Sequence, residues 1–197
     1  MLFVIFFILA FIPLSLIYPI KRIGKKNLKE LKGKNYIISC NHMSGLDPVM
    51  LDISFKKKHY FLAKIELFKN KFKGWFLKSF GGVPVDRKNV DPKSIKTIFR
   101  LIEKKKNIAI FPQGTRTKQP EILDGEAKEG VAMFAIRTGT PVIPMMYSRK
   151  IKAFRRTKLI IGKPIYPDET RKKDKSYITE FSNLIIEKMN ELLKGEK

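Results

Sequence analysis

The sequence predicts an α/β fold: a mostly parallel mixed sheet flanked by helices, with an N-terminal hydrophobic membrane anchor. Two observations support this prediction. Short apolar runs alternate with longer amphipathic stretches, and the first 20 residues contain no charged side chain. Alternating strands and helices are typical of a parallel sheet that is covered by helices. A chain of 197 residues is long enough to form one domain with a substantial core.

Residues 1–20 are expected to form the anchor, because a helix of about 20 residues reaches roughly 30 Å, the thickness of a hydrocarbon core. Pro13 and Pro19 interrupt a regular helix. A shallow or re-entrant anchor and a buried helix of a soluble protein therefore remain alternatives to a full span. The basic linker at 21–34 predicts that the domain at 35–197 lies on the cytoplasmic side of the cell membrane.

Within the domain, apolar runs bounded by turn residues predict short strands. They are expected at residues 36–40, 60–63, 83–85, 107–111, 141–146 and 158–161. Helices are expected where apolar residues recur at helical spacing, at 48–55, 66–80, 91–106, 127–137 and 176–193. Asp47 before Pro48 predicts a helix start, with Asp47 as the N-cap and Pro48 at the first helical position. Gly139 predicts the end of the fourth helix.

The net charge of +23, from 41 basic and 18 acidic residues, indicates an anionic partner. Phospholipid headgroups, an acidic carrier protein, a phosphorylated substrate and nucleic acid all satisfy this requirement. Residues 55–80 interleave lysines with aromatic residues, a pattern that suits an anionic bilayer or a single-stranded nucleic acid. The neighbouring apolar anchor favours an anionic membrane lipid, so no nucleic-acid partner is expected.

Few residues are available for redox or metal chemistry. The single cysteine, Cys40, excludes an internal disulfide and follows an apolar run, so we expect it in the core. The two histidines and the scattered carboxylates predict no metal site. His59 is expected to be a structural or surface residue.

The segment Asn41-His42-Met43-Ser44-Gly45-Leu46-Asp47 carries the first candidate site. Asp47 precedes a proline, and side chains five residues apart do not face each other on a helix. We therefore expect His42 in a loop that folds back over the helix start. Asp47 then accepts a hydrogen bond from one imidazole nitrogen and leaves the other free to take a proton. By itself, such a pair is also compatible with a plain turn.

Two further segments carry candidate residues. In Phe111-Pro112-Gln113-Gly114-Thr115-Arg116-Thr117, Gly114 permits close backbone approach, Thr115 offers a hydroxyl and Arg116 a positive charge, which suits a phosphate. Gly81-Gly82-Val83-Pro84-Val85-Asp86-Arg87 is by itself a glycine turn with a surface ion pair. Because sites gather at the carboxyl ends of parallel strands, the loops after 36–40 and 107–111 are expected to face one crevice.

Taken in their order along the chain, the three segments resemble the glycerolipid acyltransferase superfamily, in particular the 1-acyl-sn-glycerol-3-phosphate acyltransferases. His42 and Asp47 match the family's His-x4-Asp block, and residues 82–87 and 111–117 match the second and third blocks. Val142-Ile143-Pro144 matches the fourth, and the resemblance extends from about Gly33 to Ile165. It implies that 35–197 is an α/β acyltransferase domain.

The resemblance also implies roles for single residues. His42 would be the general base on the free hydroxyl of a lysophospholipid, and Asp47 would orient it. Lys64 would stabilise the thioester oxyanion, with Arg87 and Arg116 as candidates for the phosphate. The third block usually carries glutamate where this chain has Gln113. Because the amide lacks the negative charge, Gln113 is a candidate determinant of the acceptor.

The implied reaction is the synthesis of phosphatidic acid from lysophosphatidic acid in phospholipid biosynthesis. No cofactor is implied: the co-substrate is an acyl thioester of acyl carrier protein or of coenzyme A, and both donors are anionic. A different lysolipid acceptor is one alternative. The other is a non-catalytic basic protein that binds membrane or nucleic acid.

Overall fold

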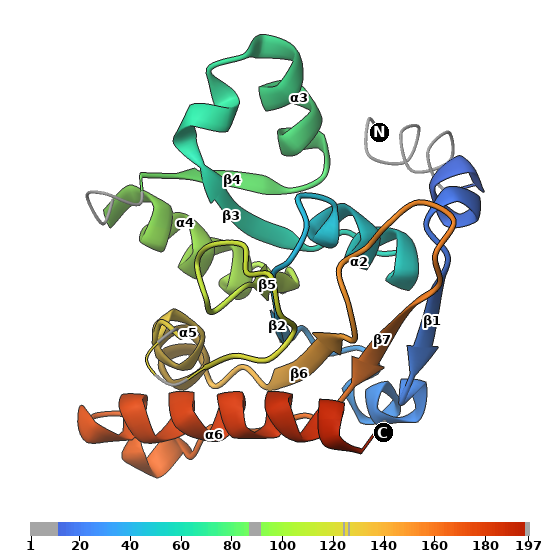
Figure 1. Ribbon diagram of the computed structural model, residues 1–197. Coiled ribbons are helices and arrows are strands. Elements are labelled where there is room, and N and C mark those ends of the chain that lie inside the picture. Colours follow the sequence, from blue (N-terminus) through green and yellow to red (C-terminus); the bar gives the residue numbers. More distant parts are fainter. Residues whose placement is uncertain (1–11, 87–91, 124, 126, 196–197) are drawn as a thin grey trace.

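The computed structural model describes residues 12–86, 92–123, 125 and 127–195. Its centre is a seven-stranded sheet with the strand order β1-β7-β6-β2-β5-β3-β4 (Figure 1). The strands are β1 (Ile20–Ile23), β2 (Ile37–Cys40), β3 (Tyr60–Lys64), β4 (Gly82–Val85), β5 (Ile108–Ile110), β6 (Val142–Tyr147) and β7 (Thr157–Ile161). Neighbouring strands pair in parallel, except for the antiparallel pair β6–β7. The predicted α/β fold with a mostly parallel mixed sheet is confirmed.

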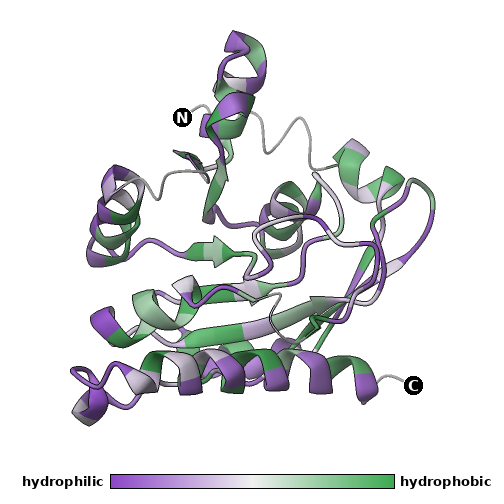
Figure 2. Ribbon diagram, turned by 60° about the vertical axis from the view of Figure 1, so that its left-hand side comes forward, coloured by the Kyte–Doolittle hydropathy of each residue, from purple (hydrophilic) through white to green (hydrophobic). Residues whose placement is uncertain are grey.

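Helices cover both faces of the sheet. One face carries α4 (Pro92–Glu103), α5 (Gly130–Thr138) and α6 (Ser176–Lys194), and the other carries α2 (Asp47–Phe55), while α3 (Lys71–Ser79) lies beyond β3 and β4 (Figure 1). Figure 2 shows mostly hydrophobic central strands and mixed hydrophobic and hydrophilic positions along α6. Short 3-10 helices complete the fold: η1 (Lys25–Leu31), η2 (Ile65–Phe68) and η3 (Glu169–Arg171).

Alternate residues of each strand fill two separate cores. On β2, Ile38 packs in the core on the α2 side, whereas Ile37 packs in the core beneath α4, α5 and α6. Both side chains are fully buried. Successive side chains of a strand point to opposite faces, so a strand covered on both sides is apolar throughout. This is why the strands of this chain appear in the sequence as continuous apolar runs.

The strand β1 was not predicted, because it lies within the segment expected to be a basic linker. Ile20–Ile23 pairs in parallel with β7, and the Thr157 N–H donates to the Pro19 carbonyl at 3.0 Å. Two of its four residues, Lys21 and Arg22, are charged, a pattern that an edge strand tolerates because one of its edges faces solvent. The chain after residue 20 is therefore part of the sheet.

Two expectations about helices were wrong in detail. The helix expected over 66–80 is divided into η2 and α3, because the Asn70 side chain accepts a hydrogen bond from the Lys73 N–H and starts a new helix there. Asp47 is not an N-cap. The helix α2 already includes it, and Leu46 is the capping residue. The Asp47 carboxylate binds the preceding loop instead.

The expected membrane anchor is only partly covered by the structure. Residues 1–11 lie outside the described residues, and residues 12–17 are helical. Across the described part of the chain, we find no helix with both the length and the apolar character needed to cross a membrane.

The position of α2 is held by a second histidine–aspartate pair. The His59 N–H and Nδ1 both lie within hydrogen-bonding distance of Asp52 Oδ1, at 2.8 and 2.9 Å, and Nε2 lies 3.3 Å from the Tyr36 hydroxyl. His59 and Asp52 are 1% and 0% exposed. The expectation that His59 is structural agrees with this geometry, since the pair joins α2 to the start of β3.

This buried pair predicts a pH-dependent stability. Burial raises the pKa of Asp52 from 3.8 to about 6, although His59 opposes the shift. Because the folded-state pKa is the higher one, its contribution to stability is fully present below pH ~4 and is lost as the pH rises through about 6. Relative to Asp52→Asn, the wild type should lose about 3 kcal/mol of unfolding free energy over this range. Urea unfolding of both proteins at several pH values tests this prediction. If the unfolding free energies of the two proteins changed with pH in the same way, the prediction would be wrong.

Candidate active site

His42, in the loop between β2 and α2, forms a hydrogen-bonded pair with Asp47, the first residue of α2. His42 Nδ1 lies 2.8 Å from Asp47 Oδ2, and the same oxygen accepts hydrogen bonds from the Met43 and Ser44 N–H groups, each at 2.7 Å. The Asp47 side chain is fully buried, whereas that of His42 is 14% exposed. Since the carboxylate accepts, Nδ1 carries the proton and Nε2 is the acceptor nitrogen. The predicted hydrogen bond between His42 and Asp47 is present, and their roles as base and orienting group stay a prediction.

The residue before the histidine fixes this loop to the sheet. Asn41 is fully buried, and its side chain accepts from the Tyr147 N–H at 2.8 Å and donates to the Tyr147 carbonyl at 3.0 Å. It also donates to the Pro120 carbonyl, at 2.9 Å. The Tyr147 hydroxyl in turn donates to the Asp47 carbonyl at 3.1 Å. An asparagine suits this position because its amide offers both a donor and an acceptor.

Hydrogen bonds join the loops after β2 and β5, as predicted from their position at the carboxyl ends of two paired strands. The Gln113 side chain accepts from the His42 N–H at 2.9 Å and donates to the Thr117 hydroxyl at 3.1 Å. The Thr117 N–H donates to the His42 carbonyl at 2.8 Å. Gln113 is 5% exposed. Both ends of its amide therefore serve to hold His42 in place.

A cavity of about 970 Å³ opens beside His42. This is at the upper end of the range of about 300–1,000 Å³ that is usual for ligand pockets. Its apolar walls come from β3, α3, α4 and α5, and include Phe61, Leu77, Ile95 and Phe134. The His42 ring also packs against the Phe111 ring, with centroids 4.5 Å apart. His42 thus borders an apolar chamber that is large enough for a chain of methylene groups, whereas Asp47 lies buried behind it.

The same cavity contains most of the polar residues predicted for the site. Those that line it are His42, Lys64, Gly114, Thr115 and Arg116. The Arg116 guanidinium reaches the histidine loop, since a Cβ added to Gly45 would lie 3.8 Å from its Nη1 atom. Gln113 is not among the lining residues. Arg87, the other candidate for the phosphate, lies outside the described residues.

Lys128 is a cavity residue that the sequence analysis missed. Its backbone N–H donates to the Pro112 carbonyl at 2.9 Å, and its side chain passes Gly114, whose φ is +66°. The helix expected from residue 127 begins at Gly130, which leaves Lys128 in the loop before α5. A lysine in so basic a chain carries no distinguishing signal. Its contact with Gly114 appears only in the fold.

Cys40 lies next to the site but cannot act as its nucleophile. It is fully buried, and burial together with the neighbouring Asp47 raises the pKa of its thiol well above the ordinary value. A thiol in this state is not a thiolate at physiological pH. The expectation that Cys40 belongs to the core is confirmed.

Comparisons with known proteins agree with this geometry. The sequence model of the acyltransferase family matches residues 19–148. The 1-acyl-sn-glycerol-3-phosphate acyltransferase of Bacillus subtilis is 35% identical over 159 residues, which cover 78% of this chain and 77% of that protein. The enzyme of the same name from Streptococcus pneumoniae is 28% identical over 159 residues, and the match covers 77% of this chain and 58% of the relative.

A solved structure shares the fold. The crystal structure of the 1-acyl-sn-glycerophosphate acyltransferase PlsC from Thermotoga maritima has a TM-score of 0.64 at 25% sequence identity. The match covers 94% of this chain and 77% of that one. The family match contains the complete histidine–aspartate loop and the loop that binds it. The chain therefore belongs to the acyltransferase family and is an enzyme of that family.

Proposed function

We propose that this chain transfers a fatty acyl group from an acyl thioester to the free hydroxyl of 1-acyl-sn-glycerol 3-phosphate, giving phosphatidic acid for phospholipid biosynthesis. The observation that carries the proposal is the joint position of three features. His42, held by Asp47, borders a cavity that has cationic residues at its loops and an apolar chamber behind them. A phosphorylated acceptor and an acyl chain both find suitable chemistry there. The names of the relatives support the choice of acceptor.

The reaction requires one proton to move twice. His42 Nε2 takes the proton of the acceptor hydroxyl while the hydroxyl oxygen attacks the thioester carbonyl carbon. The C–S bond then breaks, and the imidazolium returns the proton to the departing sulfur. The products are an ester and a free thiol. Asp47 keeps the imidazole in the required tautomer and stabilises the imidazolium, as in other catalytic triads.

Lys64 and Arg116 provide the positive charge of the site. Lys64, at the end of β3, lines the cavity and is assigned to the oxyanion that develops on the thioester carbonyl. Arg116 is assigned to the acceptor's phosphate, together with the loop at Gly114 and Thr115, since an arginine fork matches phosphate oxygens. Lys128 adds a second cation beside that loop.

The enzyme is proposed to work at the cytoplasmic surface of the cell membrane. Two residues of the cavity wall, Leu67 and Phe72, are 46% and 73% exposed, and Trp75 on the same helix as Phe72 is 41% exposed. Exposed apolar residues beside a lipid-binding cavity suit contact with a bilayer, and the lysines of α3 suit its anionic headgroups. Acyl carrier protein and coenzyme A thioesters both remain candidate donors.

A panel of acceptors tests the proposed reaction. The purified chain is supplied with labelled acyl-carrier-protein and coenzyme A thioesters, and with lysophosphatidic acid, lysophosphatidylglycerol or lysophosphatidylcholine. We expect the highest kcat/KM for lysophosphatidic acid. A preference for either of the other lysolipids would overturn the assignment of the acceptor while keeping the reaction type.

Arg116→Gln should weaken acceptor binding more than it affects the chemical step. Loss of a charge-assisted contact to phosphate corresponds to roughly 1.5–3 kcal/mol, or about 10- to 100-fold in KM for lysophosphatidic acid. KM for an acceptor without phosphate, monoacylglycerol, should change little. Steady-state kinetics with both acceptors distinguish these effects, with Lys172→Gln as a control that removes an exposed charge elsewhere. Equal losses for both acceptors would contradict the role of Arg116.

Gln113→Glu should leave the ranking of acceptors unchanged. The side chain at this position holds two loops together and does not line the cavity, and a carboxylate still accepts from the His42 N–H. The measurement is the same acceptor panel with the variant. A change in the preferred lysolipid would show that residue 113 contacts the acceptor.

A further inference from the structure

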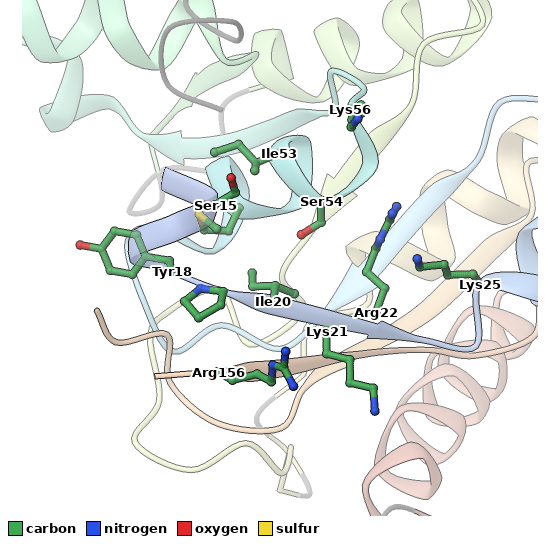
Figure 3. Close-up of a pocket in the computed structure, with 12 residues that line it drawn as sticks. Ser15, Tyr18, Ile20, Lys21, Arg22, Lys25, Ile53, Ser54, Lys56 and Arg156 are labelled. Atoms are coloured by element: carbon green, nitrogen blue, oxygen red, sulfur yellow. The ribbon is translucent and has the colours of Figure 1, made fainter. Parts of the chain in front are cut away.

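A second cavity, of about 530 Å³, lies along β1 on the side of the sheet that carries α2 (Figure 3). Its walls come from residues 15–20, from β1 and the start of η1, from the second half of α2 and from the segment before β7. No residue lines both this cavity and the active-site cavity. The helix α2 contributes to each: Pro48 to the active site, and Met50, Ile53 and Ser54 to the second cavity, which Lys56 also lines just after the helix ends.

The lining of this second cavity is strongly cationic, and none of the described residues that form it carries a carboxylate. Its charged residues are Lys21, Arg22, Lys25, Lys56 and Arg156. Among the described residues, no acidic side chain forms an ion pair with Lys21, Arg22, Lys25 or Arg156. Arg22 is held by the Phe55 ring, whose centroid lies 5.9 Å from its guanidinium carbon. Like charges gathered without counter-charges attract an anion.

The remaining lining is largely apolar. It includes Pro19 and Ile20, and the buried side chains of Met50 and Ile53 on α2. Figure 3 shows Arg22 and Lys25 gathered toward one end, Tyr18 at the other, and Ile20 between them, facing α2. Lys21 and Arg156 lie between these two ends, below Ile20 in the view, so the cavity combines cationic side chains with apolar lining, an arrangement that matches an amphiphile with an anionic headgroup.

The position of the cavity indicates that this amphiphile is a lipid of the membrane. Four of its lining residues, Ser15, Tyr18, Pro19 and Ile20, belong to the uncharged segment that covers residues 1–20. β1 is an edge strand, so the cavity lies at the rim of the sheet, and residues 12 and 16 of the preceding helix expose 63% and 70% of their side chains. An apolar segment next to a cationic cavity suits the boundary between acyl chains and headgroups.

We propose that this second cavity binds an anionic glycerophospholipid of the membrane, with Arg22 and Lys25 on its phosphate and an acyl chain against Tyr18, Ile20 and Ile53. The site is distinct from the one that binds substrate, and it rests on the proposed membrane association. It fixes β1 and α2 against the bilayer. Because α2 also carries Asp47, a lipid in this cavity sets the orientation of the active site toward the membrane.

Binding to vesicles tests the proposal with the full chain. Flotation measures the partitioning into phosphatidylcholine vesicles with and without phosphatidylglycerol, for wild type and Arg22→Gln/Lys25→Gln. The matched control, Lys172→Gln/Lys173→Gln, removes the same charge from exposed positions next to η3. We expect the cavity variant to lose about tenfold or more in partitioning to phosphatidylglycerol vesicles. Equal losses in the two variants would show a diffuse charge effect and overturn the site.

A soluble lipid distinguishes binding in this cavity from attraction by the overall positive charge of the surface. Dihexanoyl-phosphatidylglycerol below its micelle concentration should raise the Tm of wild type and of the lysine control, but not that of Arg22→Gln/Lys25→Gln. Ser54→Phe fills the cavity and keeps every charge, so it should abolish the same shift. An equal Tm shift with inorganic phosphate alone would show that the site recognises a free anion and would overturn the lipid assignment.

The activity assay tests the proposed function independently of the proposed lipid site. With lysophosphatidic acid in detergent micelles, Arg22→Gln/Lys25→Gln should retain the kcat of wild type, because neither residue lines the active-site cavity. If wild type transferred no acyl group, the soluble-lipid shift would still measure the second site. If transfer were normal and the shift absent, only the lipid site would fail.

Discussion

Replacement of His42 with alanine lowers kcat for acyl transfer by about 10²–10⁴-fold, the usual contribution of a general base. Asp47 orients the imidazole at the edge of the cavity. In the proposed mechanism, Nε2 of this imidazole receives the hydroxyl proton. Steady-state kinetics with saturating acyl thioester and lysophosphatidic acid measure the effect. KM for the acceptor should change little, because Arg116 and the neighbouring loop remain.

The interpretation requires that the variant be folded. Asp47 keeps its two backbone donors, Met43 and Ser44, when the imidazole is removed, so we expect only a modest decrease in Tm. The far-ultraviolet circular dichroism should match that of wild type. A folded His42→Ala enzyme with a kcat within a few-fold of wild type would remove His42 from the mechanism.

Asp47→Asn should lower kcat by about 10²–10³-fold for a different reason. Three donors converge on Oδ2, so an asparagine that places its carbonyl oxygen there keeps all three hydrogen bonds. It loses the charge and places its amide nitrogen at the buried position of Oδ1, which has no hydrogen-bond partner among the described residues. A charge pair about 4 Å apart is worth ~4 kcal/mol at an effective dielectric constant of ~20. This stabilisation of the imidazolium exists only while His42 carries the substrate's proton, and the loss should therefore fall on kcat.

Asp47→Ala is the comparison that separates charge from structure. It leaves the Met43 and Ser44 N–H groups without their acceptor in a buried loop, which costs roughly 1–3 kcal/mol for each unsatisfied group. We expect a clear fall in Tm for Asp47→Ala and a smaller fall for Asp47→Asn. If Asp47→Asn kept nearly full kcat, Asp47 would serve only to shape the loop.

The sequence predicts the interior of the fold better than its edge. Strands β2, β5 and β6 are covered on both faces, so continuous apolar runs reveal them directly. The edge strand β1 contains two charged residues among four and has no such signal. The division between η2 and α3 depends on one capping side chain, Asn70, which the helical spacing of the surrounding apolar residues conceals.

The histidine–aspartate pair could be predicted because the two residues are five positions apart at the start of α2, where the proline after Asp47 limits the backbone. The role of Gln113 could not, since it depends on hydrogen bonds to His42 and Thr117 that form only when β2 and β5 pair. The same holds for the Asp52–His59 pair, which joins a helix to the next strand. Contacts between elements are set by the tertiary fold and leave no local pattern.

Direct transfer without an acyl-enzyme is the central claim, and one single-turnover experiment tests it. Excess enzyme is mixed with a labelled acyl thioester, first alone and then with lysophosphatidic acid, and the label is followed on protein and lipid. We predict no label on the protein, and label in phosphatidic acid with one thiol released for each ester formed. Label bound covalently to the protein before the acceptor is added, and then transferred to lipid, would contradict attack by the acceptor hydroxyl through His42.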